Sequence, residues 1–226
     1  YCGVGCQVLL HVKDEHIFRV SAPFEAAPNY GMLCVKGRFG TDFTTHPARL
    51  RAPLIRVNRD QPRSATPVWR EAGWEEALEL VADRLAEVAR RHGGDSIATF
   101  ACAKAINEDN YLLQKLTRAI LGTNNVDHCS RLCHAGSVTG LQLAIGSSAM
   151  SNSIAEMEHL EAFIVTGSNT TETHPVISNF LKRAVRQNGA KLVVIDPRKI
   201  EMTDFATLWL RQRPGTDVAV WQAMAH

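Results

Sequence analysis

The chain of 226 residues lacks several features that would decide its class at once. No apolar run reaches the ~18 residues that a membrane-spanning helix needs, and no internal repeat or low-complexity tract is present. A large excess of one charge is also missing, since 25 Lys and Arg stand against 23 Asp and Glu, for a net charge of +2. Proteins that bind nucleic acid through its phosphates usually carry a strong positive excess. The sequence therefore predicts no membrane span and no nucleic-acid partner.

The sequence also lacks an initiating methionine and a charged-then-apolar leader, and it begins at Tyr1. Residues 221–226 stop inside an apolar helical pattern without a capping residue. We therefore expect a piece of a longer protein, truncated at both ends. We expect that longer protein to be cytoplasmic.

What is present is the composition of a globular protein, with 45 % apolar and 21 % charged residues. Short strand patterns at 7–12 and 17–20, separated by a charged turn at 13–15, predict a small β-rich domain over residues 1–60. The Pro-marked, Arg-rich segment 47–67 is typical of an irregular connector.

From residue 61 onward the patterns change to those of an α/β domain. A strand, a turn, a helix and a second strand within about 35 residues predict a βαβ unit with a parallel sheet. Asn107 is expected to cap a helix. The predicted strands lie at 97–101, 162–166, 191–195 and 208–210, and the predicted helices at 74–92, 107–121, 175–187, after residue 134 and from residue 217. The predicted fold is thus a small β-rich domain followed by a Rossmann-like parallel-sheet α/β domain over residues 61–226.

Three of the six cysteines, Cys2, Cys6 and Cys34, lie in the predicted β-rich domain. Structural zinc usually takes two cysteine pairs with short spacings, so a single distant third cysteine fits zinc poorly. An iron–sulphur cluster accepts soft thiolates and tolerates one distant ligand. Gly3 and Gly5 would let the backbone bend close to the cluster sulphurs. The spacing favours a cluster, and zinc, disulfides or buried thiols remain as alternatives.

A second group of cysteines precedes a histidine, as Cys129, Cys133 and His134. A thiolate beside an imidazole and near Arg131 can be a nucleophile or a metal ligand. The alternative is that both cysteines are small buried apolar residues. Cys102 has alanine neighbours next to a predicted strand and is expected in the core.

Three turns at strand ends have the composition of phosphate and nucleotide contacts. Gly167 follows a predicted strand and precedes a helix, where a glycine lets the backbone approach a phosphate. Asp196 ends the next strand, where a carboxylate can accept hydrogen bonds from a guanine or a ribose. Residues 214–217 repeat this arrangement after another strand. The alternative is ordinary turn and cap chemistry.

Taken together, these segments resemble the catalytic (alpha) subunit of molybdenum- or tungsten-dependent formate dehydrogenase, in the bis-molybdopterin guanine dinucleotide oxidoreductase family. The matching segments cover nearly the whole chain in the order of the family: 1–7, 33–40, 122–127, 131–135, 167–175, 196–198 and 214–217. Any one of them is a weak signal, whereas the ordered set is highly specific.

The resemblance implies a role for each group. Cys2, Cys6 and Cys34 would be three of four ligands of a 4Fe-4S cluster, whose first ligand in the family lies three residues before Cys2. Lys36 would lie between the cluster and the pterin as an electron relay, and Lys104 near the pterin. Cys133 would bind the metal and His134 would be the active-site histidine. The dinucleotide arm of the pterin cofactor would be bound by Gly167, Ser168, Asn169, Glu172, Asp196, Arg198, Gly215, Thr216 and Asp217.

The resemblance also implies a reaction, the reversible two-electron oxidation of formate to CO2, with electrons leaving through the cluster to an iron–sulphur or flavin partner subunit. The remainder of the same catalytic chain would complete the site. One alternative is a nitrate reductase-like molybdoenzyme, against which His134 argues. Another is a non-catalytic iron–sulphur electron-relay subunit of a respiratory complex, against which Cys133 argues.

Overall fold

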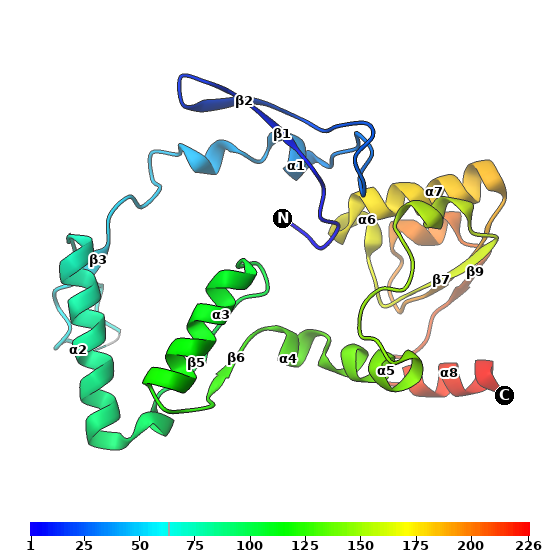
Figure 1. Ribbon diagram of the computed structural model, residues 1–226. Helices are drawn as coiled ribbons and strands as arrows, with labels where there is room; N and C mark the ends of the chain where they lie inside the picture. The colour runs from blue at the N-terminus through cyan, green and yellow to red at the C-terminus, as the bar shows by residue number, and fades with distance from the viewer. Residues whose placement is uncertain (63) are drawn as a thin grey trace. The chain divides into compact units, whose positions relative to one another are not determined.

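The computed structural model describes residues 1–62 and 64–226. It forms two compact units, of which the first combines residues 1–46 with 150–226 and the second comprises residues 47–149. Figure 1 shows both units, with helices and strands labelled where there is room. The sequence predicts a boundary between two domains at residue 60, and this boundary stays a prediction. None of the described helices has the length and apolar character required to span a bilayer.

The first unit begins with an antiparallel hairpin of β1 (Leu9–Lys13) and β2 (His16–Ser21). The predicted charged turn joins the strands, and Asp14 and Glu15 adopt positive φ angles of 49° and 64° there. Two short helical segments follow, α1 (Val35–Phe39) and η1 (Asp42–Thr44).

The rest of the first unit is built on a three-stranded parallel sheet in the order β7-β8-β9. The predicted βαβ unit is confirmed, since β7 and β8 are parallel and joined through α7. Proline at the first turn of α7 and Gly189 beyond its end, with φ +71°, mark its limits. The elements are η4 (Ala155–His159), β7 (Ala162–Thr166), α6 (Thr170–Thr173), α7 (Pro175–Asn188), β8 (Lys191–Ile195), η5 (Glu201–Phe205), β9 (Leu208–Leu210) and α8 (Asp217–Ala225).

Apolar packing on α7 holds this unit together. One cluster joins α7 to the sheet and to η5 through Val165, Leu181, Leu192, Val194, Ile200 and Met202. A second cluster joins α7 to the N-terminal cysteine segment through Val4, Ile154, Val176 and Phe180. The N-terminal segment is therefore packed on the same helix as the three-stranded parallel sheet.

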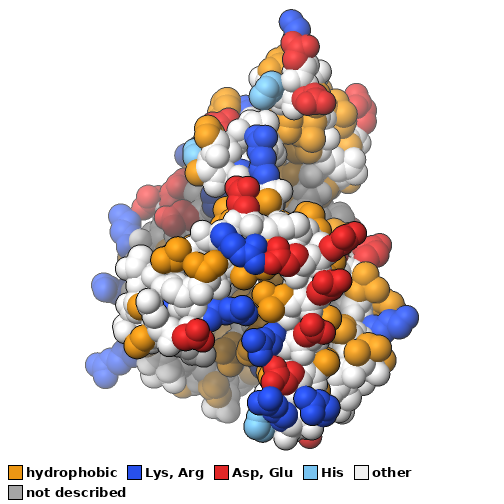
Figure 2. All heavy atoms as spheres, turned by 90° about the vertical axis from the view of Figure 1, so that its left-hand side faces the viewer, with side chains coloured by type: hydrophobic (Ala, Val, Ile, Leu, Met, Phe, Trp, Pro, Cys, Tyr) orange, Lys and Arg blue, Asp and Glu red, His pale blue; other side chains and the backbone are white. Residues whose placement is uncertain are grey.

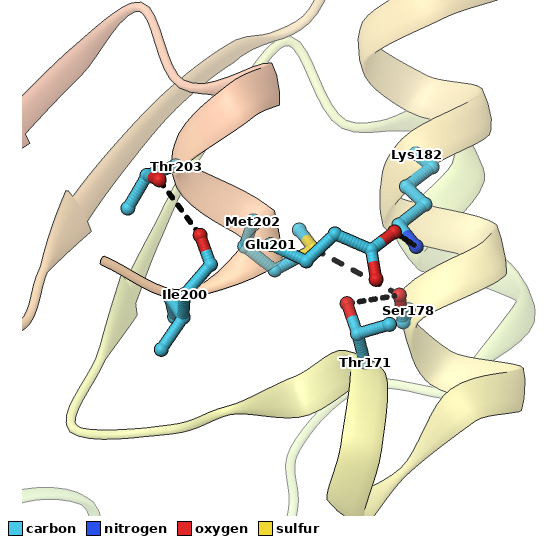
Figure 3. Close-up of polar contacts among 7 residues, drawn as sticks. All are labelled: Thr171, Ser178, Lys182, Ile200, Glu201, Met202 and Thr203. Carbon is cyan, nitrogen blue, oxygen red and sulfur yellow. Dashed lines mark hydrogen bonds and ion pairs between the residues drawn. The ribbon is translucent and has the colours of Figure 1, made fainter. Parts of the chain in front are cut away.

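Polar contacts fix α6 and η5 on α7 (Figure 3). The buried hydroxyl of Ser178 lies 3.1 Å from the Thr171 hydroxyl and 3.8 Å from the sulphur of Met202. Lys182 Nζ makes an ion pair of 2.7 Å with Glu201 Oε1. These contacts place the segment after Gly167 on the same helix that packs on the sheet.

The second unit contains two small sheets, the antiparallel pair β3–β4 and the parallel pair β5–β6. Charged pairs such as Arg91–Glu87, at 2.7 Å, lie along α2, and Figure 2 shows acidic and basic side chains interspersed with hydrophobic ones. The elements are β3 (Leu54–Arg56), β4 (Trp69–Glu71), α2 (Trp74–His92), η2 (Gly94–Ser96), β5 (Thr99–Phe100), α3 (Asn107–Lys115), η3 (Leu116–Ile120), β6 (Val126–Asp127), α4 (Ser130–Cys133) and α5 (Ala135–Ile145).

Several details of the second unit differ from the predictions. Strand β5 covers only two of the predicted five residues, because its partner β6 is equally short. Asn107 is the first helical residue of α3, and Ile106 takes the cap position. Cys102 is exposed in the loop after β5 instead of lying in the core, and its sulphur accepts a hydrogen bond from the Lys104 amide at 3.4 Å.

Candidate functional site

The three N-terminal cysteines line one cavity of about 450 Å³ in the first unit. Its other walls come from the hairpin, η1 and the segment before α1, and Gly5 lies among the lining residues with φ +73°. This conformation favours glycine, which turns the chain between Cys2 and Cys6. The structure therefore brings together the three residues that the spacing pattern predicted as a group.

The surroundings disfavour ionisation of one of these thiols, Cys6. Burial raises the pKa of the Cys6 thiol, and the neighbouring Cys2 and Cys34 sulphurs raise it further. Bound iron would reverse this effect, because a metal stabilises the thiolate form. Three cysteines that line one cavity thus fit a 4Fe-4S cluster, which is held by thiolates. In the described part of the chain, no group of three or more His, Cys, Asp or Glu side chains is arranged to hold a single metal ion.

Cys34 is positioned by the start of α1. It is the N-cap residue of this helix, and its Sγ accepts a hydrogen bond from the Gly37 amide at 3.5 Å. Lys36 follows in the first turn of α1 with an exposed side chain. Lys36 thus lies two residues after Cys34, one of the predicted cluster ligands. The predicted role of Lys36 as an electron relay stays a prediction.

The predicted nucleotide residues lie at the carboxyl ends of the parallel strands, where α/β sheets bind ligands. Gly167 follows β7, has φ +55°, and its amide donates to the Ile195 carbonyl at 3.0 Å. A Cβ at this position would meet no atom within 4 Å. The open space beside this glycine leaves room for a phosphate to approach the chain.

Buried acceptors follow each of these strands. Asp196, 5 % exposed, ends β8, and its Oδ1 accepts from the Arg198 amide at 2.8 Å. Asn169 Oδ1 and Gln212 Oε1 are both buried without a hydrogen-bond partner among the described residues. Because an unpaired buried acceptor is unfavourable, these oxygens fit a ligand that donates hydrogen bonds, as the N–H groups of guanine do. Gln212 was not predicted; its position two residues after β9 was the available signal.

Side chains of β9 and the residues that follow it fix the surrounding loops. The indole of Trp209 donates to the Asp196 carbonyl at 2.8 Å. Asp217, the first residue of α8, accepts from Gln212 Nε2 at 2.9 Å. Gly215 has φ +85°, and Thr216 is the N-cap residue of α8. The turns at 167–169, 196–198 and 215–217 therefore follow three adjacent strands, and Glu172 lies in α6 with an exposed side chain.

Cys133 and His134 belong to the second unit, at the junction of α4 and α5. Both Cys129 and Cys133 are exposed, which contradicts the alternative that they are buried apolar residues. The Cys133 amide donates to the Cys129 carbonyl at 3.0 Å, and the His134 amide donates to that of Ser130 at 3.2 Å. Cys133 and His134 are thus consecutive residues at the end of one helical turn, and both are exposed.

One carboxylate anchors this turn. Asp127 accepts hydrogen bonds from the His128 amide at 2.9 Å and from Arg131 Nε at 2.6 Å. The Arg131 guanidinium and the His128 amide hold the pKa of Asp127 below its ordinary value. The pair forms part of the wall of a polar cavity of about 610 Å³, together with the α3 residues Asn107 and Tyr111. Lys104 lies in the loop between β5 and α3, and its neighbours on both sides line the same cavity.

Comparisons with known protein families define the class of protein that this arrangement represents. The Molybdopterin oxidoreductase Fe4S4 domain matches residues 1–46, which contain the three clustered cysteines. The Molybdopterin oxidoreductase family matches residues 49–226. The chain therefore belongs to the molybdopterin oxidoreductase family, and its cofactors are a 4Fe-4S cluster and molybdopterin.

Individual relatives agree with this assignment. The F420-dependent formate dehydrogenase 1 subunit alpha of Methanococcus maripaludis is 41 % identical over all of this chain and 32 % of its own length. The probable oxidoreductase YjgC of Bacillus subtilis is also 41 % identical, over 22 % of its length. A putative formate dehydrogenase of Staphylococcus aureus (strain MRSA252) is 39 % identical over 97 % of this chain and 21 % of its own.

A solved structure shares the fold. Acetylene hydratase from Pelobacter acetylenicus matches 99 % of this chain and 30 % of its own, with a TM-score of 0.80 and 24 % identity. The predicted α/β class is thereby confirmed. The chain spans less than a third of the length of each of these relatives.

Proposed function

We propose that the longer protein carrying this chain oxidises formate reversibly to CO2 and sends the electrons through its 4Fe-4S cluster to an iron–sulphur or flavin partner subunit. The observation that carries this proposal is the exposed Cys133–His134 pair on its anchored turn. Relatives about 40 % identical that are named as formate dehydrogenases support the same substrate.

Each group of residues has a defined task in this proposal. The bound molybdenum- or tungsten-pterin centre supplies two-electron redox chemistry. Cys133 provides an anionic sulphur ligand to that centre, and the neighbouring His134 imidazole orients formate or holds the proton that leaves it. The acceptors at the ends of β7, β8 and β9 bind the guanine dinucleotide arm, and Lys104 contacts the pterin.

The cluster residues complete the electron path. Cys2, Cys6 and Cys34 hold iron in the first unit, and Lys36 beside them presents a cation next to the cluster. A cation stabilises the more negative, reduced states of both redox groups. Lys36 would thereby favour electron transfer between the bound pterin and the cluster. We place the whole protein in the cytoplasm.

The test is Cys133→Ala in the native holoprotein purified without oxygen. We expect formate oxidation to be lost, because the metal loses its thiolate ligand, while the electron paramagnetic resonance (EPR) signal of the reduced cluster is unchanged. Ser96→Ala is the control, since it removes an exposed hydroxyl of the same unit whose hydrogen bond, to the Gly93 carbonyl at 2.7 Å, lies outside the candidate site. Unchanged formate turnover in Cys133→Ala would refute the ligand assignment.

Two other outcomes would replace the proposal. Native protein that reduces nitrate and leaves formate untouched would be a nitrate reductase-like enzyme. Native protein that contains iron but neither molybdenum nor tungsten would be an electron-relay subunit. Elemental analysis and the two substrate assays on the same preparation distinguish these results.

A further inference from the structure

A single asparagine joins the two cysteine-bearing segments of the first unit. Asn29 has 0 % exposure. Its Oδ1 accepts a hydrogen bond from the Gln7 amide at 2.8 Å, and its Nδ2 donates to the Gln7 carbonyl at 3.1 Å. The same Nδ2 donates to the Met32 carbonyl at 2.8 Å. The buried amide thus uses both donors and its acceptor on backbone groups.

The partners of Asn29 lie next to the cluster ligands. Gln7 directly follows Cys6, and Met32 precedes Cys34 by two residues. Backbone hydrogen bonds tighten the loop between them, since the Met32 amide donates to the Asn29 carbonyl at 2.8 Å and the Gly31 amide to that of Pro23 at 2.9 Å. The side chain therefore spans two segments that are far apart in sequence but line one cavity.

We propose that Asn29 is a positioning residue that holds Cys6 and Cys34 in the spacing that the 4Fe-4S cluster requires. The inference rests on the cluster assignment but not on the substrate. Partners behind metal ligands orient those ligands, and their loss lowers metal affinity. Asn29 does not contact the cysteine side chains in this way. It holds the backbone of the two segments that carry them.

Only an amide of this length satisfies the three backbone groups. Aspartate has nearly the same shape but cannot donate to the carbonyls of Gln7 and Met32 when ionised. Serine is too short to span both segments. Either change leaves buried backbone groups unpaired, which is unfavourable.

The test compares Asn29→Asp and Asn29→Ser with the wild-type holoprotein. We expect the half-life of the cluster in the presence of an iron chelator to fall about 10-fold or more, the scale found for outer partners of metal ligands. We also expect a shifted EPR spectrum of the reduced cluster. Amide hydrogen exchange of the segment around Gln7 should quicken in both variants.

Two controls separate positioning from general destabilisation. Ser178→Ala removes a fully buried polar contact of the same unit, away from the cysteines, and should lower thermal stability without changing cluster release. Asn188→Asp alters an exposed amide that donates to the Glu158 carbonyl at 2.7 Å and should change neither.

The proposal fails if the Asn29 variants keep the wild-type cluster half-life and EPR spectrum. It also fails if Ser178→Ala loses its cluster as fast as they do. A variant that accumulates poorly is judged by hydrogen exchange, where unchanged exchange around Gln7 overturns the proposal. Since every readout concerns iron or the backbone, absence of formate oxidation would refute the proposed function and leave this inference standing.

Discussion

At the scale of single residues, the turn that carries Cys133 depends on short-range polar contacts instead of burial. No residue of α4 is buried, so apolar packing does not fix its orientation. The Asp127 carboxylate supplies the anchor by accepting from one backbone amide and one guanidinium. The Asp127–Arg131 ion pair is exposed, and exposed pairs add little to global stability. Its effect is therefore local order at the candidate metal ligand.

The protonation of Asp127 gives a test at this scale. Its pKa is lowered by the Arg131 hydrogen bond first and by the His128 amide second. A carboxyl with a depressed pKa contributes its stabilisation above the ordinary value of about 3.9 and loses it as the pH falls through the folded value. We expect Arg131→Gln to raise the pKa of Asp127 toward, but not to, its ordinary value, because the amide hydrogen bond remains.

Carbon-13 NMR of labelled aspartate carboxyl groups measures this titration. Arg84→Gln is the control, because it removes a guanidinium that pairs with Glu87 in the same unit and should leave Asp127 unchanged. An identical Asp127 titration in wild type and Arg131→Gln would show that the ion pair does not exist in solution.

The residues that sequence motifs revealed are those with recognisable chemistry. Cys2, Cys6 and Cys34 were grouped by spacing, and the structure places them in one cavity. Asn29 was missed because nothing in the sequence marks its side chain as buried, whereas Gln212 was missed although it lies two residues after a predicted strand. Cys102 was placed wrongly in the core because its alanine neighbours suggested burial, whereas the two-residue strand β5 ends before it.

At the scale of elements, the parallel sheet and its helix were predicted almost residue by residue. Strand β7 covers the predicted 162–166 and β8 the predicted 191–195. Their apolar, largely β-branched residues and the Pro175 and Gly189 boundaries of α7 all favour the same structure, and such agreement makes prediction reliable. The segment 107–121 was predicted as one helix but changes to a π-helix at Leu116, because its hydrogen-bond pattern depends on tertiary contacts such as that of Thr117 with Thr99.

Alanine substitutions at two glycines test whether the turn after β7 contacts the cofactor. Gly167 and Gly189 both have positive φ angles, of +55° and +71°, and in both a Cβ would meet no atom within 4 Å. We expect Gly167→Ala and Gly189→Ala to lower the free energy of unfolding by a similar amount, about 1–2 kcal/mol, because a side chain is strained in this conformation. Only Gly167→Ala should also lower the molybdopterin content, since its methyl group would occupy the open space in which the proposed site places the phosphate.

Urea unfolding measures the first effect, and the molybdopterin content of purified protein measures the second. Equal cofactor content in the two variants would show that the backbone of the Gly167 turn does not approach the dinucleotide.

At the scale of the whole molecule, the first unit is discontinuous in sequence, because residues 1–46 pack with residues 150–226. The packing that joins these parts lies on α7, where Val4 of the cysteine segment contacts Val176 and Phe180. The ring of Tyr30 also approaches Phe180 edge-on, with centroids 6.3 Å apart. The cysteine segment and the parallel sheet β7-β8-β9 therefore share one helix, an arrangement that no local sequence pattern predicts.

Shortening Phe180 tests whether this packing couples the two cofactor regions. The side chain is 3 % exposed, so Phe180→Ala should lower the free energy of unfolding by about 3–5 kcal/mol in denaturant titrations. Phe100→Ala serves as the control, because that ring is 82 % exposed and its loss should cost less than about 0.5 kcal/mol. Because Val4 lies between Cys2 and Cys6, we also expect Phe180→Ala to release its cluster faster to a chelator. A destabilised variant that releases iron at the wild-type rate would mean that the cysteine segment keeps its order without α7.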